Sequence, residues 1–160
     1  MTPHPAPVDV EEALRVEIAG FRALHKLLAA EAEALRSADV DSLSTLTTAK
    51  LQQVSALQAL ARQRSEALRR AGLVDSGAGV KAWLATAAHP DRAAAAWKTL
   101  ADLALESKRQ NEINGRLAAR QRWHFDAALG ALLQAAGVPS VYGADGRARR
   151  QDLGSTRLAV

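Results

Sequence analysis

The sequence predicts an all-α protein: an elongated antiparallel bundle of three long helices, with one short helix and a flexible C-terminal tail. Hydrophobic residues make up 48% of the 160-residue chain, much of it Ala and Leu, whereas aromatic residues make up only 4%. This composition favours helices over sheets. Apolar residues also recur every three or four positions in three separate segments, which is the spacing of one face of a helix.

The first helix is expected to begin near Asp9, after a short disordered leader, residues 1–8, in which three prolines oppose helix formation. Asp9 is a favourable N-cap, and Glu12 follows it at the spacing of a capping box. The helix should run to a break at Ser37-Ala38-Asp39. Its apolar stripe comprises Leu14, Ile18, Phe21, Leu24, Leu28, Ala32 and Leu35.

The second helix should be capped by Asp39 or Asp41 and should end before Gly72, which we expect as a left-handed C-cap. Lys50 and Arg64 lie at the edges of its stripe, where we expect their charges to reach water. The very short connection to the first helix predicts an antiparallel hairpin. The stripe of this second helix comprises Leu43, Leu46, Val54, Leu57, Leu60 or Ala61, and Leu68.

A short helix is expected over Val80–Ala88, ended by the proline at position 90. Its Trp83, together with Trp97, is expected to cover one end of the hairpin rather than to bind a ligand. Asp91 should then cap a last helix that runs to Ala136. Residues 9–136 are thus predicted to form one bundle domain, followed by a flexible basic tail over residues 137–160.

The last helix spans roughly 68 Å if it is unbroken, so it is longer than the hairpin. Part of it must therefore protrude, bend or break, and Gly115 and Gly130 are the candidate positions. Its seam is apolar at both ends, but the middle holds Ser107, Asn111, Asn114 and Gln121. A buried Asn pair can fix helix register, with Gly115 allowing close packing. The alternative is that the polar middle is a recognition surface, and the spacing leaves both interpretations open.

Several classes of function are disfavoured by what the chain lacks. The absence of cysteine excludes disulfides, thiol catalysis and Cys-ligated zinc. The chain contains no uninterrupted run of 18 apolar residues, so no membrane span is predicted. The N-terminus lacks the pattern of a signal peptide. The four histidines show no metal-ligand spacing, and no catalytic arrangement or phosphate-binding loop is recognisable. We therefore expect a cytoplasmic protein that is not an enzyme and needs no cofactor or metal.

The stretch Asn111-Glu112-Ile113-Asn114-Gly115-Arg116-Leu117 resembles the FlgN-type flagellar export chaperones. Members of this family carry Asn-x-x-Asn-Gly-x-Leu in their last long helix. Residues 24–35 resemble the family's first helix, residues 39–50 resemble the start of its second, and residues 142–146 resemble a tail motif. The likeness covers most of residues 10–146. One departure is Ala118, which follows Leu117 where a larger aliphatic residue is usual.

The resemblance implies a cytoplasmic type III export chaperone without a small-molecule substrate. Such a chaperone binds the flagellar hook–filament junction proteins, prevents their premature assembly and delivers them to the export gate. Tyr142 in the tail is expected to contact the export apparatus. One face of the last helix is expected to contact the client, through Asn111, Asn114, Gly115, Leu117, Phe125, Leu129 and Leu132.

Two alternatives remain open. Residues 81–160 carry a net charge of +5, against −1 for residues 1–80, and residues 108–122 hold five Lys or Arg against one Glu. Because Trp123 and Phe125 follow, this segment has the basic and aromatic character of a nucleic-acid-binding surface. The basic residues are spread around the helix and no known reading motif is present, which disfavours nucleic acid. The other alternative is a coiled-coil scaffold without a specific client.

Overall fold

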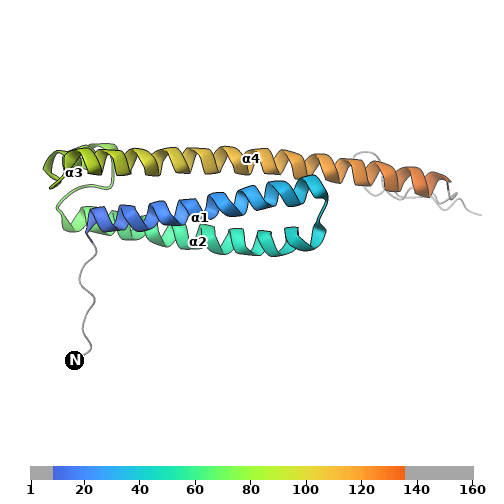
Figure 1. Cartoon of the computed structure of the whole chain (residues 1–160), viewed down its shortest axis with the longest axis horizontal. Coiled ribbons are helices and arrows are strands. Elements are labelled where there is room, and N and C mark those ends of the chain that lie inside the picture. The colour runs from blue at the N-terminus through green and yellow to red at the C-terminus, as the bar shows by residue number, and fades with distance from the viewer. Residues whose placement is uncertain (1–8, 136–160) are drawn as a thin grey trace, which may run out of the picture. The chain divides into compact units, whose positions relative to one another are not determined.

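The computed structural model describes residues 9–135, which form four helices: α1 (Val10–Ser37), α2 (Val40–Arg70), α3 (Gly77–Thr86) and α4 (Pro90–Ala135) (Figure 1). No strand occurs in this part of the chain, so the predicted all-α fold of three long helices and one short helix is confirmed. The predicted leader over residues 1–8 and the predicted tail over residues 137–160 lie outside the described residues. None of the four helices is both long and apolar enough to cross a membrane.

By their internal contacts the residues form two compact units, the first ending at Ala118 and the second beginning at Ala119. α4 therefore contributes its first part, residues 90–118, to the unit that contains the hairpin. Its last part, residues 119–135, belongs to the second unit. α4 is a single helix of 46 residues that continues through both Gly115 and Gly130, so neither glycine breaks it.

The start of α1 and the hairpin turn follow local sequence signals with one exception. Asp9 caps α1, since its Oδ1 accepts a hydrogen bond of 2.8 Å from the Glu12 amide. The Glu12 carboxylate does not close the predicted capping box but bonds Arg15, which lowers the pKa of Glu12 below its ordinary value. In the turn, Ala38 adopts a left-handed conformation at φ 55°, and Asp39 caps α2 by accepting from the Ser42 amide at 3.1 Å.

The end of α2 and the starts of α3 and α4 refine the predicted boundaries. Gly72 has the expected left-handed conformation at φ +75°, and the Leu73 amide bonds the Leu68 carbonyl at 2.9 Å. α3 begins at Gly77 rather than Val80, because Ser76 caps it by accepting from the Gly79 amide. α4 begins at Pro90, the first-turn position where a missing N–H costs nothing, so Asp91 lies in the first turn and is not the cap.

α1 and α2 lie antiparallel (Figure 1), and two largely buried ion pairs join them. Arg64 of α2 pairs with Glu17 of α1, and Lys50 pairs with Glu31. The two acidic residues and the two basic residues are each separated by 14 positions, or two heptads. The Leu57 side chain of α2 packs closely on Gly20, where a Cβ atom would lie 2.9 Å from Leu57 Cδ2.

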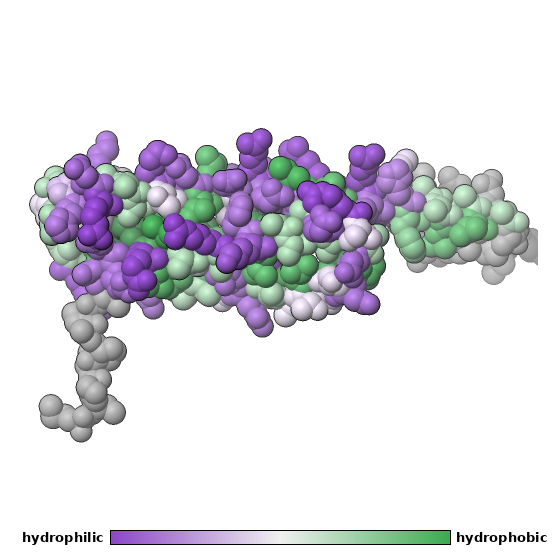
Figure 2. All heavy atoms as spheres, viewed as in Figure 1, coloured by the Kyte–Doolittle hydropathy of each residue, from purple (hydrophilic) through white to green (hydrophobic). Residues whose placement is uncertain are grey.

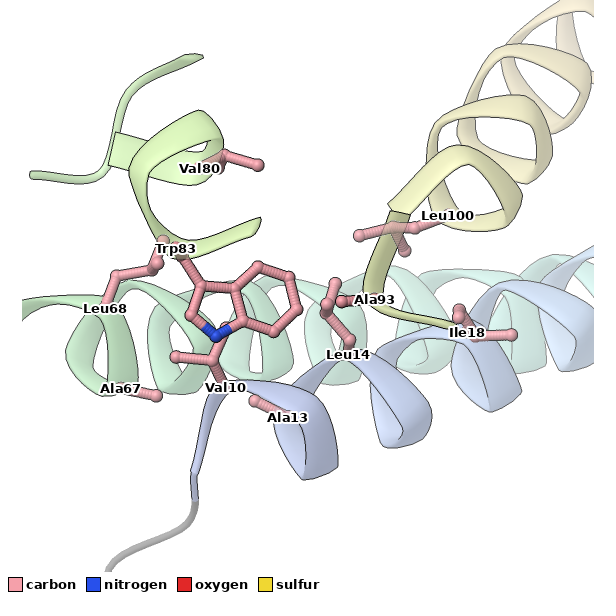
Figure 3. Packing of buried hydrophobic residues seen from close by; sticks show 10 residues of the cluster. All are labelled: Val10, Ala13, Leu14, Ile18, Ala67, Leu68, Val80, Trp83, Ala93 and Leu100. Carbon is pink, nitrogen blue, oxygen red and sulfur yellow. The ribbon is translucent and has the colours of Figure 1, made fainter. Parts of the chain in front are cut away.

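The main hydrophobic core lies where all four helices meet, at the α3 end of the hairpin. Trp83 of α3 lies among side chains of α1 and α2, near Val10 and Ala67 (Figure 3). Ala93 and Leu100 bring α4 into this core, and Trp97 packs against it, as the sequence predicts for both tryptophans. A second cluster, nearer the hairpin turn, has its buried members on α1 and α2 alone: Leu24, Leu28 and Leu57. Among the described residues of α4 beyond Leu100, the buried ones are the polar Ser107 and Asn114.

Candidate functional site

Asn114 lies at the centre of a buried polar cluster between α4 and α1. The residue is 2% exposed. Nδ2 donates to the Leu28 carbonyl and to Glu31 Oε2, each at 2.8 Å, and Oδ1 accepts from Gln110 Nε2 at 2.9 Å. The amide group is thus paired on both sides, as a buried polar group must be to avoid a large desolvation cost.

Lys50 extends this cluster to α2. Its Nζ lies 2.5 Å from Glu31 Oε1 and donates to Asn111 Oδ1 at 3.3 Å. Glu31 therefore accepts from Lys50 through one carboxylate oxygen and from Asn114 through the other. Three helices are joined at one level: Asn114 bonds the Glu31 carboxylate directly, and Asn111 bonds Lys50, the cationic partner of that carboxylate.

A second polar cluster lies two heptads away, at the α3 end. Arg64 Nε donates to Glu17 Oε2 at 2.7 Å, and a terminal nitrogen of Arg64 lies 3.3 Å from Asp75 Oδ1. The Arg64 guanidinium also lies over the Trp97 ring, 5.3 Å from its centroid. Each level thus contains an acid from α1, a base from α2 and a residue of α4, and the α4 residues, Trp97 and Asn111, are again 14 positions apart.

The prediction that Lys50 and Arg64 direct their charges to water is wrong. Both are largely buried and paired with carboxylates that the sequence analysis did not single out, Glu17 and Glu31. A signal for them is present in the sequence. Once α1 and α2 are paired as an antiparallel hairpin, the 14-residue spacing of the two acids matches that of the two bases.

The seven predicted client-contact residues have different environments. Asn114 is buried, Leu117 is half-buried, and Asn111 and Gly115 are exposed. No heavy atom lies within 4 Å of the position that a Cβ on Gly115 would occupy. The interpretation that Gly115 allows close packing within the bundle is therefore wrong for the described part of the chain. Asn114 behaves as a register residue in this structure, since the partners of its side chain belong to the bundle.

We expect Gly115→Ala to stabilise the protein by about 1 kcal/mol, because alanine is the better helix former and its methyl group meets no neighbour. Chemical denaturation of both proteins measures this difference. Gly20→Ala is the matched control and should gain less stability than Gly115→Ala, because its Cβ would approach Leu57 Cδ2 at 2.9 Å and the leucine side chain must shift. Destabilisation by Gly115→Ala would mean that a neighbour outside the described residues needs this glycine.

Residues 119–135 carry an apolar face that is exposed in this structure. Phe125 is 69% exposed, Leu129 44% and Leu132 68%. Their spacing of four and three positions places them on one side of α4. The part of this segment visible in Figure 2 is predominantly hydrophobic. Such a face is typical of a binding surface, because soluble proteins rarely leave contiguous large apolar side chains in water.

Trp123 is also exposed, at 65%, and stacks edge-on against His124 with ring centroids 4.9 Å apart. It falls on a different side of the helix from Phe125, since two positions correspond to about 200° of rotation. Within residues 9–135 no group of three or more His, Asp or Glu side chains could hold a metal ion. Tyr142, predicted to contact the export apparatus, lies outside the described residues.

Comparisons with known proteins agree with this architecture. The sequence matches the family model described as FlgN protein over residues 8–150. The crystal structure of a chain described as a flagella synthesis protein FlgN, from Pseudomonas aeruginosa, is 25% identical in sequence. The similarity covers 84% of this chain and 98% of that chain, with a TM-score of 0.62. No curated protein matches the sequence.

Proposed function

Because the chain belongs to the FlgN family of flagellar proteins, we propose that it is a cytoplasmic type III export chaperone for the hook–filament junction proteins. In this role it binds a terminal helical segment of its client, prevents premature assembly and delivers the client to the export gate. The chemistry is that of a binding protein, which needs no cofactor and transforms no substrate.

The exposed apolar face of residues 119–135 is the observation that supports this proposal most. Fully burying one large apolar side chain contributes about 1.5–3 kcal/mol. Phe125 and Leu132 are more than two-thirds exposed and Leu129 is 44% exposed, so a client helix gains a large part of that free energy by covering them. Amphipathic helices that dock on an apolar helical face are a common mode of peptide recognition.

The predicted contact residues then divide into two roles. Phe125, Leu129 and Leu132 supply the apolar contact area. Asn114 acts from inside the bundle, where its hydrogen bonds to Leu28 and Glu31 hold α4 at one register. Three further predicted residues, Asn111, Gly115 and Leu117, are at least partly exposed and stay candidates for direct client contact.

The salt dependence of binding separates this proposal from nucleic-acid binding. Phosphate contacts by basic residues weaken steeply as salt concentration rises, whereas an apolar helix interface does not. We expect a terminal peptide of a junction protein to bind with similar affinity at low and high salt, and duplex DNA to bind weakly at both. Tight, salt-sensitive binding of DNA without peptide binding would instead support a nucleic-acid-binding protein.

We assign delivery to the tail and propose Tyr142 as its contact with the export apparatus. An aromatic side chain is a common anchor of binding interfaces. Tyr142→Ala should leave the affinity for the client unchanged but impair swimming of the cells that carry it. Tyr142→Phe is the matched control that keeps the ring. Normal swimming of Tyr142→Ala cells at normal protein levels would remove Tyr142 from this role while leaving the client assignment intact.

A further inference from the structure

α4 presents two lines of residues to the hairpin, and each line repeats every 14 positions. One line faces α1 and includes Leu100 and Asn114, both buried. The other meets α2, where Trp97 lies under Arg64 and Asn111 bonds Lys50. A helix that packs against two neighbours needs such a broad stripe, whereas a helix in a two-stranded coiled coil needs only a narrow seam.

The repeat continues in residues 119–135. Fourteen positions after Asn114 stands Ala128, and fourteen positions after Asn111 stands Phe125. The flanking charges repeat as well, since Arg122 and Asp126 stand where Lys108 and Glu112 stand one repeat earlier. Residues 119–135 thus have the two-line pattern of a helix covered by two others, although their side chains are exposed or half-exposed wherever they are described.

The width of the exposed stripe supports two covering helices. Among Phe125, Ala128, Leu129 and Leu132, the outermost two are Ala128 and Leu129, which are successive residues and therefore separated by about 100°. Phe125 and Leu132 lie between these edges. A single helix covers the narrower seam of a coiled coil and would leave one edge in water.

The contacts of Trp97 in the bundle indicate which side chains the two covering helices should carry. There, an aromatic ring of α4 lies under a guanidinium of one hairpin helix, and that guanidinium bonds a carboxylate of the other helix at 2.7 Å. Phe125 offers the next aromatic ring on the same line of α4, 28 positions after Trp97 and 69% exposed. A cation over an aromatic face is attracted by the ring quadrupole, more strongly once water is excluded.

We propose that residues 119–135 bind a pair of antiparallel client helices joined by an acid–base pair, with the basic side chain seated on the Phe125 ring. The two client helices cover this segment in the same way as α1 and α2 cover residues 90–118. The inference rests on the proposed function and names the chemistry of its client: two antiparallel amphipathic helices with a cross-helix Glu–Arg or Glu–Lys pair, rather than one helix.

The test uses the full chain and a synthetic antiparallel two-helix peptide, closed by a disulfide at one end and carrying one cross-helix Glu–Arg pair. Its comparison probes are each helix alone and the same two-helix peptide with Arg replaced by Met. We expect the paired peptide to bind at least about tenfold tighter than either single helix, because one helix leaves an edge of the stripe uncovered. Replacing Arg by Met should weaken binding by about fivefold.

Phe125→Leu supplies the decisive control, since it keeps apolar area but removes the ring. With this variant the Arg and Met probes should bind equally, while circular dichroism and the thermal unfolding midpoint stay as in the parent protein. Equal affinity of a single helix and the pair would overturn the proposal, and so would a preference for Arg that survives Phe125→Leu.

Binding of a junction-protein terminal segment, measured in parallel, keeps the two proposals distinguishable. Binding of that segment without the two-helix preference overturns only the inference about helix pairing. The two-helix preference without binding of that segment supports the inference about this face and overturns the assigned client.

Discussion

A chain that ends at Arg120 is expected to bind a junction-protein terminal segment at least about 100-fold more weakly than the full chain. The truncation removes Phe125, Leu129 and Leu132, each worth about 1.5–3 kcal/mol when fully buried. Even the lower end of that sum, about 4.5 kcal/mol, exceeds the roughly 2.7 kcal/mol that a 100-fold change in affinity represents. Titration calorimetry with the same peptide measures the difference.

The same truncation should leave the thermal unfolding midpoint nearly unchanged, because it removes no buried residue of the unit that ends at Ala118. A chain that ends at Ala135 is the matched control, since it keeps the apolar face and lacks Tyr142. It should bind the peptide like the full chain. Full-strength binding by the chain that ends at Arg120 would locate client recognition on the hairpin instead.

Arg64→Ala should be among the most destabilising single substitutions in the hairpin, by about 3–5 kcal/mol. The change leaves the Glu17 carboxylate buried without its cationic partner, which costs far more than the intact pair contributes. Denaturant unfolding, followed by circular dichroism, measures the loss. Arg36→Ala is the control, because the Arg36–Glu33 pair is exposed and its removal should change stability by less than about 1 kcal/mol.

Replacing both members of the buried pair, as Glu17→Leu with Arg64→Met, should recover most of the lost stability. Well-packed apolar side chains can substitute for a buried ion pair at little cost. If Arg64→Ala alone costs less than about 1 kcal/mol, then water satisfies Glu17 and the pair does not fix the register of the hairpin.

The helix boundaries were largely predictable because their causes are local. Asp9 and Gly72 act within one turn of the chain, through one capping hydrogen bond and one left-handed residue. The left-handed residue at the hairpin turn could not be predicted as such, because Ala38 carries none of the usual preference of glycine for positive φ. The burial of Glu17 and Glu31 depends on partners more than 18 positions away, which propensity and helical periodicity do not contain.

The candidate site likewise combines features that follow from local sequence with features that depend on distant partners. The apolar face of Phe125, Leu129 and Leu132 follows from helical spacing alone. Asn114 could not be assigned in that way, because a buried register residue and a client-facing residue occupy the same position of the seam. Its partners decide the matter for this structure, and they are a backbone carbonyl and a carboxylate of α1, more than 80 positions away.

Hydrogen exchange of the full chain, with and without a hook–filament junction protein, tests the central claim most directly. We expect complex formation to slow amide exchange across residues 119–135, because covering an exposed helix stabilises its hydrogen bonds against local opening. The amides of α1 and α2 should change little. Protection confined to α1 and α2, with unchanged exchange over residues 119–135, would contradict the account.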